Sequence, residues 1–194
     1  LYLYRGFSMT EPMFIMEYTD FGYNIDANSW EDLKQYTCCF TGHRPHNFRS
    51  DKESINRIRR ALKREICSAV DDGYRIFVSG GALGADTWAA EAVLELKNDY
   101  PFIFLEMVIP CSGQDFKRVR NDKLIYKSLL ERADTVIYTS KQPYFDGCMK
   151  LRNEFIIRRS GRLIAVFNGK SFGGTSQTIS LAKSYGLELN IIDA

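Results

Sequence analysis

The sequence predicts an α/β domain built on a doubly wound, mainly parallel sheet of five to six strands with helices on both faces. Short apolar segments alternate with segments of helical length and composition about five times along the 194 residues. The apolar segments are mostly uncharged, which is typical of strands buried on both faces of a parallel sheet. Glycine-rich loops follow two of these segments. Because such sheets bind ligands outside the carboxyl ends of their strands, we expect the functional residues at that edge.

The first predicted strand covers residues 37–41, and the helix after it begins at a capping box over residues 50–53. Apolar residues then recur at helical spacing as far as Val70, and Gly73 ends the helix. The other face of this helix carries five basic side chains, namely Arg57, Arg59, Arg60, Lys63 and Arg64. A charge run of this kind predicts a solvated helix face, with nucleic-acid contact as the alternative.

The second strand, residues 76–78, leads into a glycine loop over residues 79–86 and then into a helix over residues 88–97. Three glycines in this loop lack the Cβ atoms that keep a ligand away from the backbone. Free amides and the positive end of the helix dipole then suit an anion, most often a phosphate. The loop matches neither GxGxxG nor GxxxxGK[ST], and a plain tight connection is the alternative interpretation.

Asp86 is the last residue of this loop, and its carboxylate limits which part of a ligand can lie beside it. A carboxylate in the first turn of a helix repels a phosphate placed beside it. We therefore expect Asp86 to accept hydrogen bonds from loop amides, from a ribose hydroxyl or from a base edge. Capping of the helix N-terminus is the alternative role.

The rest of the chain continues the alternation of strands and helices. The predicted elements are a strand over 102–109 that stops at Pro110, a helix over 116–130 broken near Asn121, a strand over 135–138, a helix over 148–159, a strand over 163–167, a helix over 176–185 and a sixth strand over 189–192. A second glycine loop over residues 168–175 opens the last helix. We expect Arg44 and Arg152 to bring planar, charged donors for phosphate or carboxylate to the same edge.

Composition limits the classes of function. A net charge of +2 gives no strong electrostatic footprint for nucleic acid, and no apolar run has the length of a membrane span. The five cysteines are odd in number and lack C-x-x-C spacing, which predicts reduced thiols in a cytoplasmic protein without a metal site. We expect no bound cofactor.

Residues 1–36 form an aromatic-rich extension that differs from the predicted domain at residues 37–194. The extension is rich in Tyr, Phe, Trp and Met and has no clear periodicity. It predicts an extra strand and turn that cover a sheet edge, with an arm over a partner subunit or over the site as the alternative.

Several segments together resemble the YpsA-like branch of the SLOG (SMF/DprA-LOG) superfamily. They are residues 37–45 (TCCFTGHRP), residues 78–86 (VSGGALGAD), Ile109-Pro110 with Gln114, Arg152-Asn153, and Gly173-Gly174-Thr175. The resemblance covers about residues 37–192. It implies a Rossmann-like domain that binds nucleotides or nucleotide derivatives, and a homodimer.

Two better-known groups of relatives imply different activities. The cytokinin-activating phosphoribohydrolases are similar at Met149-x-x-Arg152 and at the second glycine loop, but here Asn153 replaces a lysine and Thr178 stands in place of a glutamate. Loss of that carboxylate removes a stabiliser of an oxocarbenium-like transition state. The DNA-processing protein DprA is similar over residues 79–86, which implies single-stranded DNA binding, although the near-neutral charge argues against it.

The leading expectation is a protein that binds a nucleotide or nucleotide derivative, for instance as a sensor, with phosphoribohydrolase activity and single-stranded DNA binding as alternatives. The predicted ligand-binding residues are Thr41, Gly42, His43, Arg44, Ser79, Gly80, Gly81, Ala82, Gly84, Ala85, Asp86, Pro110, Gln114, Arg152, Asn153, Gly173, Gly174 and Thr175. No catalytic residue is assigned, and the candidates are Arg152, Asp86 and Glu91. We expect His43 to be a hydrogen-bonding loop residue, and the alternative role is a general acid or base.

Overall fold

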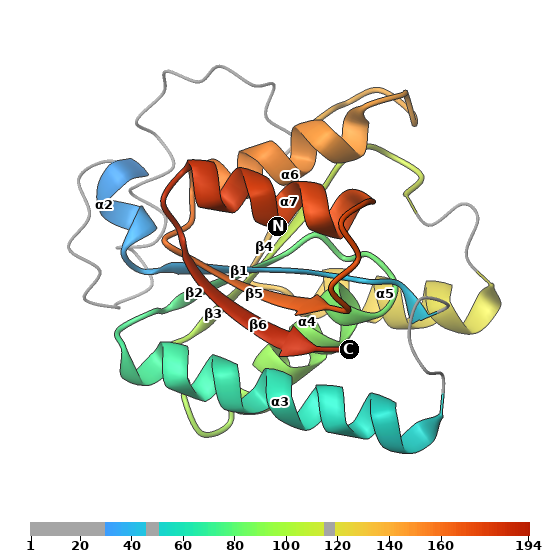
Figure 1. Ribbon diagram of the computed structural model, residues 1–194. Helices are drawn as coiled ribbons and strands as arrows, with labels where there is room; N and C mark the ends of the chain where they lie inside the picture. The colour runs from blue at the N-terminus through green and yellow to red at the C-terminus, as the bar shows by residue number, and fades with distance from the viewer. Residues whose placement is uncertain (1–29, 46–50, 115–118) are drawn as a thin grey trace.

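A computed structural model describes residues 30–45, 51–114 and 119–194 of the chain (Figure 1). Its centre is one six-stranded sheet in the order β4-β3-β2-β1-β5-β6, and all the strand pairs are parallel. The strands are β1 (Thr37–Gly42), β2 (Ile76–Ser79), β3 (Phe104–Ile109), β4 (Thr135–Tyr138), β5 (Arg162–Phe167) and β6 (Glu188–Asp193). The predicted fold class is confirmed, and the sixth strand is present.

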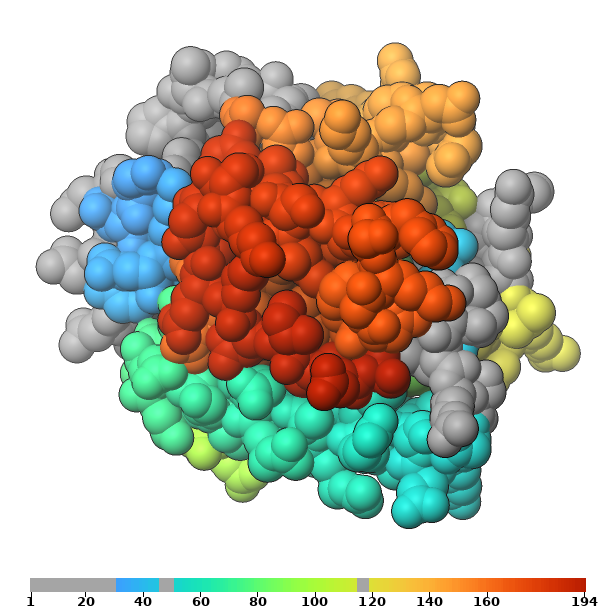
Figure 2. All heavy atoms as spheres, viewed as in Figure 1, coloured from blue at the N-terminus to red at the C-terminus, as the bar shows by residue number. Residues whose placement is uncertain are grey.

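Helices cover both faces of the sheet. They are α2 (Trp30–Lys34), α3 (Lys52–Asp71), α4 (Ala85–Leu96), α5 (Arg120–Arg132), α6 (Cys148–Arg158) and α7 (Gly174–Ser184). Helices α3, α4 and α5 pack on one face of the sheet, and α2, α6 and α7 pack on the other (Figure 1). Each face therefore has its own apolar cluster between sheet and helices. In the view of Figure 2, α7 and β6 fill the centre of the surface and α3 runs along its lower border. No described helix combines the length and apolarity that a membrane crossing requires.

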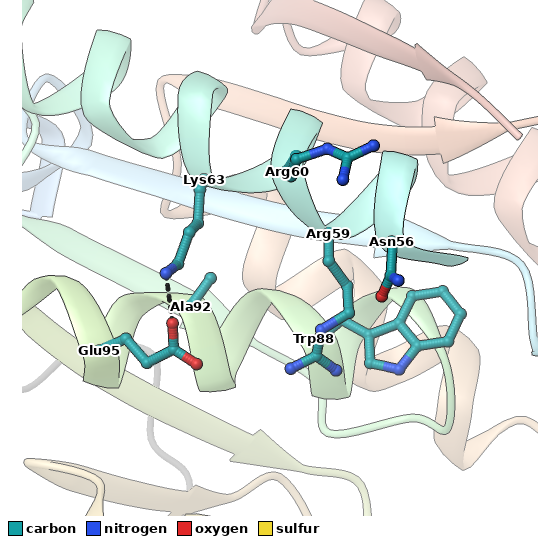
Figure 3. A pocket seen from close by; sticks show the side chains of 7 residues that line it. All are labelled: Asn56, Arg59, Arg60, Lys63, Trp88, Ala92 and Glu95. Carbon is teal, nitrogen blue, oxygen red and sulfur yellow. Dashed lines mark ion pairs between the residues drawn. The ribbon is translucent and has the colours of Figure 1, made fainter. Parts of the chain in front are cut away.

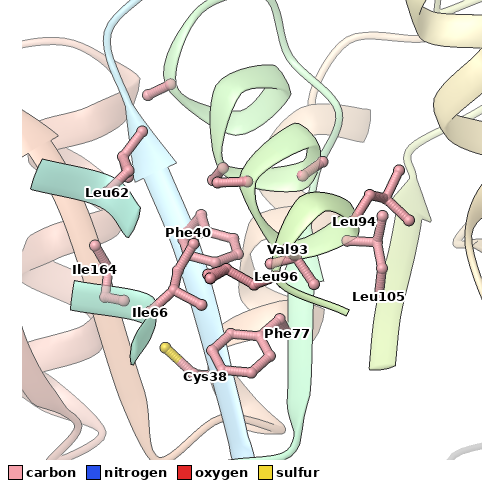
Figure 4. Packing of buried hydrophobic residues seen from close by; sticks show 14 of the residues in the cluster. Cys38, Phe40, Leu62, Ile66, Phe77, Val93, Leu94, Leu96, Leu105 and Ile164 are labelled. Carbon is pink, nitrogen blue, oxygen red and sulfur yellow. The ribbon is translucent and has the colours of Figure 1, made fainter. Parts of the chain in front are cut away.

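The core follows from the alternation of side chains along each strand. In β1, Phe40 belongs to the cluster under α3 and α4, whereas its neighbour Cys39 belongs to the cluster under α6 and α7. Figure 4 shows Phe40 and Phe77 beside Val93 of α4 in the first cluster. Because both faces of β1 are buried, its sequence is uncharged, and three consecutive apolar residues, Cys38, Cys39 and Phe40, stand at its centre.

The strand order places a reversal beside β1. The chain runs outward from β1 through β2 and β3 to β4, and α6 then returns it to β5 on the other side of β1. The loops after β1 and β5 therefore leave neighbouring strands toward opposite faces of the sheet. A crevice at such a switch point is where open parallel sheets bind ligands.

The structure corrects several predicted boundaries. The N-cap of α3 is Asp51, whose carboxylate accepts hydrogen bonds from the Ser54 amide and hydroxyl at 2.8 Å each; the predicted cap, Ser50, lies outside the described residues. Helix α5 runs from Arg120 to Arg132 and Val119 before it is extended, so helical geometry is interrupted two residues before Asn121, close to the predicted break. The predicted helical residues 116–118 lie outside the described residues.

Helices α4 and α7 begin earlier than predicted, at Ala85 and Gly174. In both, a glycine with positive φ is the N-cap, with φ 92° at Gly84 and 103° at Gly173. Gly84 and Gly173 are thus the capping residues at which these helices begin, whereas Gly80 and Gly81 lie in the loop before α4. Helix composition alone underestimates such starts, since Gly, Asp and Thr in these first turns have low helix propensity.

The described part of the N-terminal extension packs on the domain. Leu33 of α2 is only 2% exposed, and its carbonyl accepts a hydrogen bond from the Thr37 hydroxyl at 2.8 Å. The carbonyl of Tyr36 accepts from the amides of Arg75 and Ile76 at 2.8 and 2.9 Å. The segment at residues 30–36 is a helix and turn, and residues 1–29, the larger part of the range for which a strand and turn are predicted, lie outside the described ranges.

Candidate functional site

The loop after β1 lies directly against the start of α4. A Cβ built on Gly42 would lie 2.3 Å from the Cβ of Ala85, and one built on Gly84 would lie 2.7 Å from the carbonyl oxygen of His43. The amide of Ala85 also donates to that carbonyl at 3.5 Å. Two predicted loops are thus joined by close backbone contact, which only glycine permits at these positions.

Arg152 of α6 reaches the first glycine loop from the opposite face of the sheet. Its guanidinium lies on Gly80, where a Cβ would come within 1.1 Å of Nη1. The nearest carboxylate is Asp86, whose Oδ2 lies 3.7 Å from Nη1. Both residues are buried, at 5% and 6% exposure. The structure therefore brings together two of the three catalytic candidates, Arg152 and Asp86.

The partners of this buried guanidinium are weak. Beyond the long contact with Asp86, Nη2 lies 3.8 Å from the Met149 sulfur, and Nε has no hydrogen-bond partner in the described part of the chain. Burial lowers the pKa of Arg152, and the charge of Asp86 opposes that shift. Among the described residues, the site thus holds a cation that is removed from water and has no short bond to an oxygen atom.

The first glycine loop is stabilised by hydrogen bonds within itself. The Ser79 hydroxyl donates to the Asp86 carbonyl at 2.9 Å and accepts from the Gly81 amide at 3.1 Å. The Asp86 carboxylate accepts from the Ala82 amide at 3.3 Å, which confirms the expected bond to a loop amide. The alternative role of Asp86 as the N-cap is wrong, because that position is occupied by Gly84.

The loop after β3 supports the same segment. The Gln114 side-chain amide donates to the Gly80 carbonyl at 3.0 Å, and its oxygen accepts from the Tyr126 hydroxyl at 3.1 Å. Pro110 is buried, and its carbonyl accepts from the Thr139 hydroxyl at 3.2 Å. Tyr126 did not enter the predicted site, since an aromatic residue on a helix stripe is ordinarily core. Its hydroxyl bond to Gln114 is visible only in three dimensions.

His43 connects the first loop to the second. Its Nδ1 lies 3.4 Å from the Thr175 hydroxyl, and its ring stacks on Phe167 with the centroids 5.5 Å apart. Burial lowers the pKa of His43, and a hydrogen bond with Asn168 partly opposes this. His43 thus bridges the loops after β1 and β5, in agreement with a hydrogen-bonding role.

The second glycine loop is open. Gly173 and Gly174 are exposed, and a Cβ on either would meet nothing within 4 Å. At the start of α7, the Thr178 hydroxyl accepts from the Asn153 side chain at 3.0 Å and donates to the Gly174 carbonyl at 2.8 Å. The predicted residues Asn153 and Gly174 are thus brought together through a threonine.

The other predicted residues lie around this core. Thr41 is buried at the end of β1, and Arg44 is exposed in the loop that follows. Glu91 is not brought to the Arg152–Asp86 pair, because its carboxylate pairs with Arg59 of α3 at 2.8 Å.

Comparisons with known proteins identify the family of the chain and proteins of similar fold. A family model described as the YspA SLOG family matches residues 38–192. UPF0398 proteins of Bacillus thuringiensis (strain Al Hakam) and Bacillus cereus (strain Q1) are each 31% identical over 150 residues, which is 75% of this chain and 82% of the relative.

Two solved structures of DNA processing protein A have a similar fold. The Streptococcus pneumoniae protein is 20% identical with a TM-score of 0.60, over 84% of this chain and 52% of its own. The Helicobacter pylori protein, whose structure is described for its single-stranded DNA binding mode, is 24% identical with a TM-score of 0.56, over 81% and 65%. The chain thus spans about half to two thirds of these neighbours, and identities this low show a shared fold.

Proposed function

The chain belongs to the YspA SLOG family, and we propose that it binds a nucleotide or nucleotide derivative at the carboxyl edge of the sheet. The ligand would lie beside the switch point between β1 and β5. Two helix N-termini, a buried guanidinium and a buried carboxylate converge there. These groups are suited to an anionic ligand with hydroxyl or base donors.

The observation that carries this proposal is the incomplete bonding of Arg152. A guanidinium has five N–H donors, and burial makes each missing bond costly. Here its carboxylate neighbour lies at 3.7 Å and its other contact is a thioether. An oxygen of the ligand's sugar or base would supply the short, charge-assisted bonds that the described residues do not.

The open second loop is the better cradle for the phosphate. Gly173 and Gly174 have no protein atoms where a Cβ would point, and the amides there lie at the positive end of α7. The first loop is filled by Arg152 and by its own hydrogen bonds. We place the phosphate on residues 173–175, with Arg152 and Asp86 beside the rest of the ligand.

Binding is favoured over hydrolysis because of Thr178. This residue stands where the phosphoribohydrolases that the chain resembles carry a glutamate, and its hydroxyl is held by Asn153 and by a backbone carbonyl. A hydroxyl cannot carry the negative charge that stabilises an oxocarbenium-like transition state.

The test is a thermal-shift screen of the full chain against nucleoside mono-, di- and triphosphates, cyclic nucleotides and ADP-ribose derivatives. A ligand at about 100 times its Kd should stabilise the folded protein by about 2.7 kcal/mol. The double variant Arg152→Met/Asp86→Asn removes both buried charges together, so no uncompensated ion remains, and it should lose the shift. The control is Arg158→Met on the same helix, where an exposed guanidinium pairs with Glu154 at 2.7 Å.

Chromatography of each mixture separates binding from turnover. Recovery of the intact ligand supports a binding protein, whereas free base and ribose 5-phosphate would establish the phosphoribohydrolase alternative. A ligand that stabilises the double variant as strongly as the parent protein would overturn the proposed role of Arg152.

A further inference from the structure

A second candidate site lies between α3 and α4, apart from the Arg152–Asp86 pair. The two helices enclose a groove with a cavity of about 210 Å³. It is lined by Asn56, Arg59, Arg60 and Lys63 of α3 and by Trp88, Ala92 and Glu95 of α4 (Figure 3). The lining combines cations, an amide and one large aromatic ring, which distinguishes it from an ordinary apolar seam between helices.

Two of the cations are engaged by α4. Arg59 pairs with Glu91 at 2.8 Å, and Lys63 pairs with Glu95. These ion pairs join α3 to α4, and within each pair the carboxylate compensates the positive charge. Their presence means that any anion in the groove must be bound chiefly by other charges.

Uncompensated charge is supplied by a stripe along α3. Arg57, Arg60 and Arg64 are exposed, and none forms an ion pair within the described ranges. Spacings of three and four residues place them on one side of the helix, over a length of about 10 Å. A line of cations, with Arg60 at the groove itself, matches a chain of phosphates better than it matches one phosphate.

Trp88 supplies an aromatic surface next to this stripe. Its side chain is half-buried against the core, and in Figure 3 the ring lies beside Arg59 and Asn56. An indole flanked by cations and an amide can stack on a nucleobase while the charges contact the backbone. The cavity is smaller than the ~300 Å³ of pockets that enclose a whole small ligand, so it suits one base of a longer strand.

We propose that the α3–α4 groove binds single-stranded nucleic acid, with a base on Trp88 and the phosphates along Arg57, Arg60 and Arg64. A duplex fits less well, because its bases are already stacked and present no free face to Trp88. This site is independent of the nucleotide site at the carboxyl edge.

The test follows the fluorescence of Trp88 in the full chain carrying Trp30→Phe, which leaves Trp88 as the single tryptophan of the two in the sequence. Titration with an oligothymidine of about 12 nucleotides should quench it. Three phosphate contacts predict a slope of about −2 in log affinity against log salt concentration. A duplex of equal length should bind more weakly, and thymidine monophosphate should give no comparable quenching.

Variants then locate the site. By fluorescence anisotropy of a labelled strand, Trp88→Leu should weaken binding roughly tenfold and Trp88→Phe should retain most of it. Arg60→Ala should reduce the salt slope by about 0.7, whereas Arg132→Ala, an exposed arginine on α5, should not. Trp88 packs partly on the core, so the Trp88→Leu variant can fail to fold. In that case the salt slope of Arg60→Ala decides whether the strand binds in this groove.

Absence of binding, or equal losses in Arg60→Ala and Arg132→Ala, would overturn the proposal. So would affinity that does not change with salt, or stronger binding of duplex than of single strand. The Arg152→Met/Asp86→Asn variant should bind the strand like the parent protein, so failure at one site can be told from failure at the other.

Discussion

The two glycine loops of the carboxyl edge have similar sequences but opposite surroundings. In the first loop, every glycine faces the protein itself. A Cβ would lie 1.1 Å from the Arg152 guanidinium at Gly80, 2.9 Å from Met107 at Gly81 and 2.7 Å from a backbone oxygen at Gly84. Glycine is needed in this loop because other parts of the chain occupy the space.

In the second loop, a Cβ added to Gly169, Gly173 or Gly174 would have nothing within 4 Å. Glycine there serves backbone conformation, with φ 79° at Gly169 and 103° at Gly173, and leaves the amides accessible. The difference teaches that the space around a glycine-rich strand-to-helix turn can be filled by the protein's own side chain or left open. Only the environment of each Cα tells them apart.

The largest expected loss of stability comes from replacing one of two glycines that both have positive φ, Gly84 in the first loop and Gly169 in the second. Gly84→Ala adds strain at φ 92° and a clash with the backbone oxygen of His43, which cannot move away. We expect a loss of about 3 kcal/mol in the free energy of unfolding. Gly169→Ala adds the strain without the clash and should cost about 1 kcal/mol. Urea denaturation measures both losses. Equal losses would show that the close contact at Gly84 does not add to the cost of replacing a glycine with positive φ.

A smaller effect is expected for two glycines without positive φ. Gly80→Ala clashes with the end of the Arg152 side chain, so we expect a loss of about 2 kcal/mol, whereas Gly174→Ala should be nearly neutral. In an Arg152→Ala background, where only the Asp86 carboxylate oxygen at 2.9 Å remains close to the added Cβ, Gly80→Ala should cost less than about 1 kcal/mol. A double-mutant cycle from urea denaturation gives this coupling, and additive losses would show that Arg152 is not the obstacle.

The smallest effect concerns His43, which joins the two loops. Burial holds its pKa below the ordinary 6.5, so the unfolded chain binds the proton more readily than the folded chain does. Its contribution to stability is therefore complete above about pH 7 and is lost as the pH falls below 6.5 toward the lowered value.

His43→Gln should flatten the dependence of unfolding free energy on pH in that range. His46→Gln, which changes the other histidine of the chain, is the control. Urea titrations between about pH 5 and 8 measure the slopes. A steep slope that persists in His43→Gln but disappears in His46→Gln would contradict the assignment.

Sequence patterns were sufficient for the elements because each depends on local periodicity. The apolar strands and the stripe from Ile58 to Val70 predict the sheet and α3 within a few residues. Their grouping at one edge follows from the rule that parallel strands end together, and it correctly brought Arg152 to the loop at Gly80. These inferences need no knowledge of strand order.

The partners of individual groups were not predictable from the sequence. Gly80 meets Arg152, and Gln114 meets Tyr126, only because separate helices fold onto the same edge. Glu91 has the sequence position of a catalytic candidate, yet its side chain turns toward Arg59 of α3. Such contacts depend on the packing of whole elements, which periodicity does not encode.

The strand order also determines when the site is completed during synthesis. Strand β1 is synthesised before the other strands of the sheet, yet one of its two neighbours is β5. The pairing of Cys38 with Arg162 therefore forms only after β5 has been synthesised. Until then one side of an uncharged central strand is an open edge, which is a template for association with other chains. The contact between His43 and Thr175 forms later still. A nascent chain that stops before β5 therefore has the first glycine loop, but it has an unprotected sheet edge and only half of the proposed ligand site.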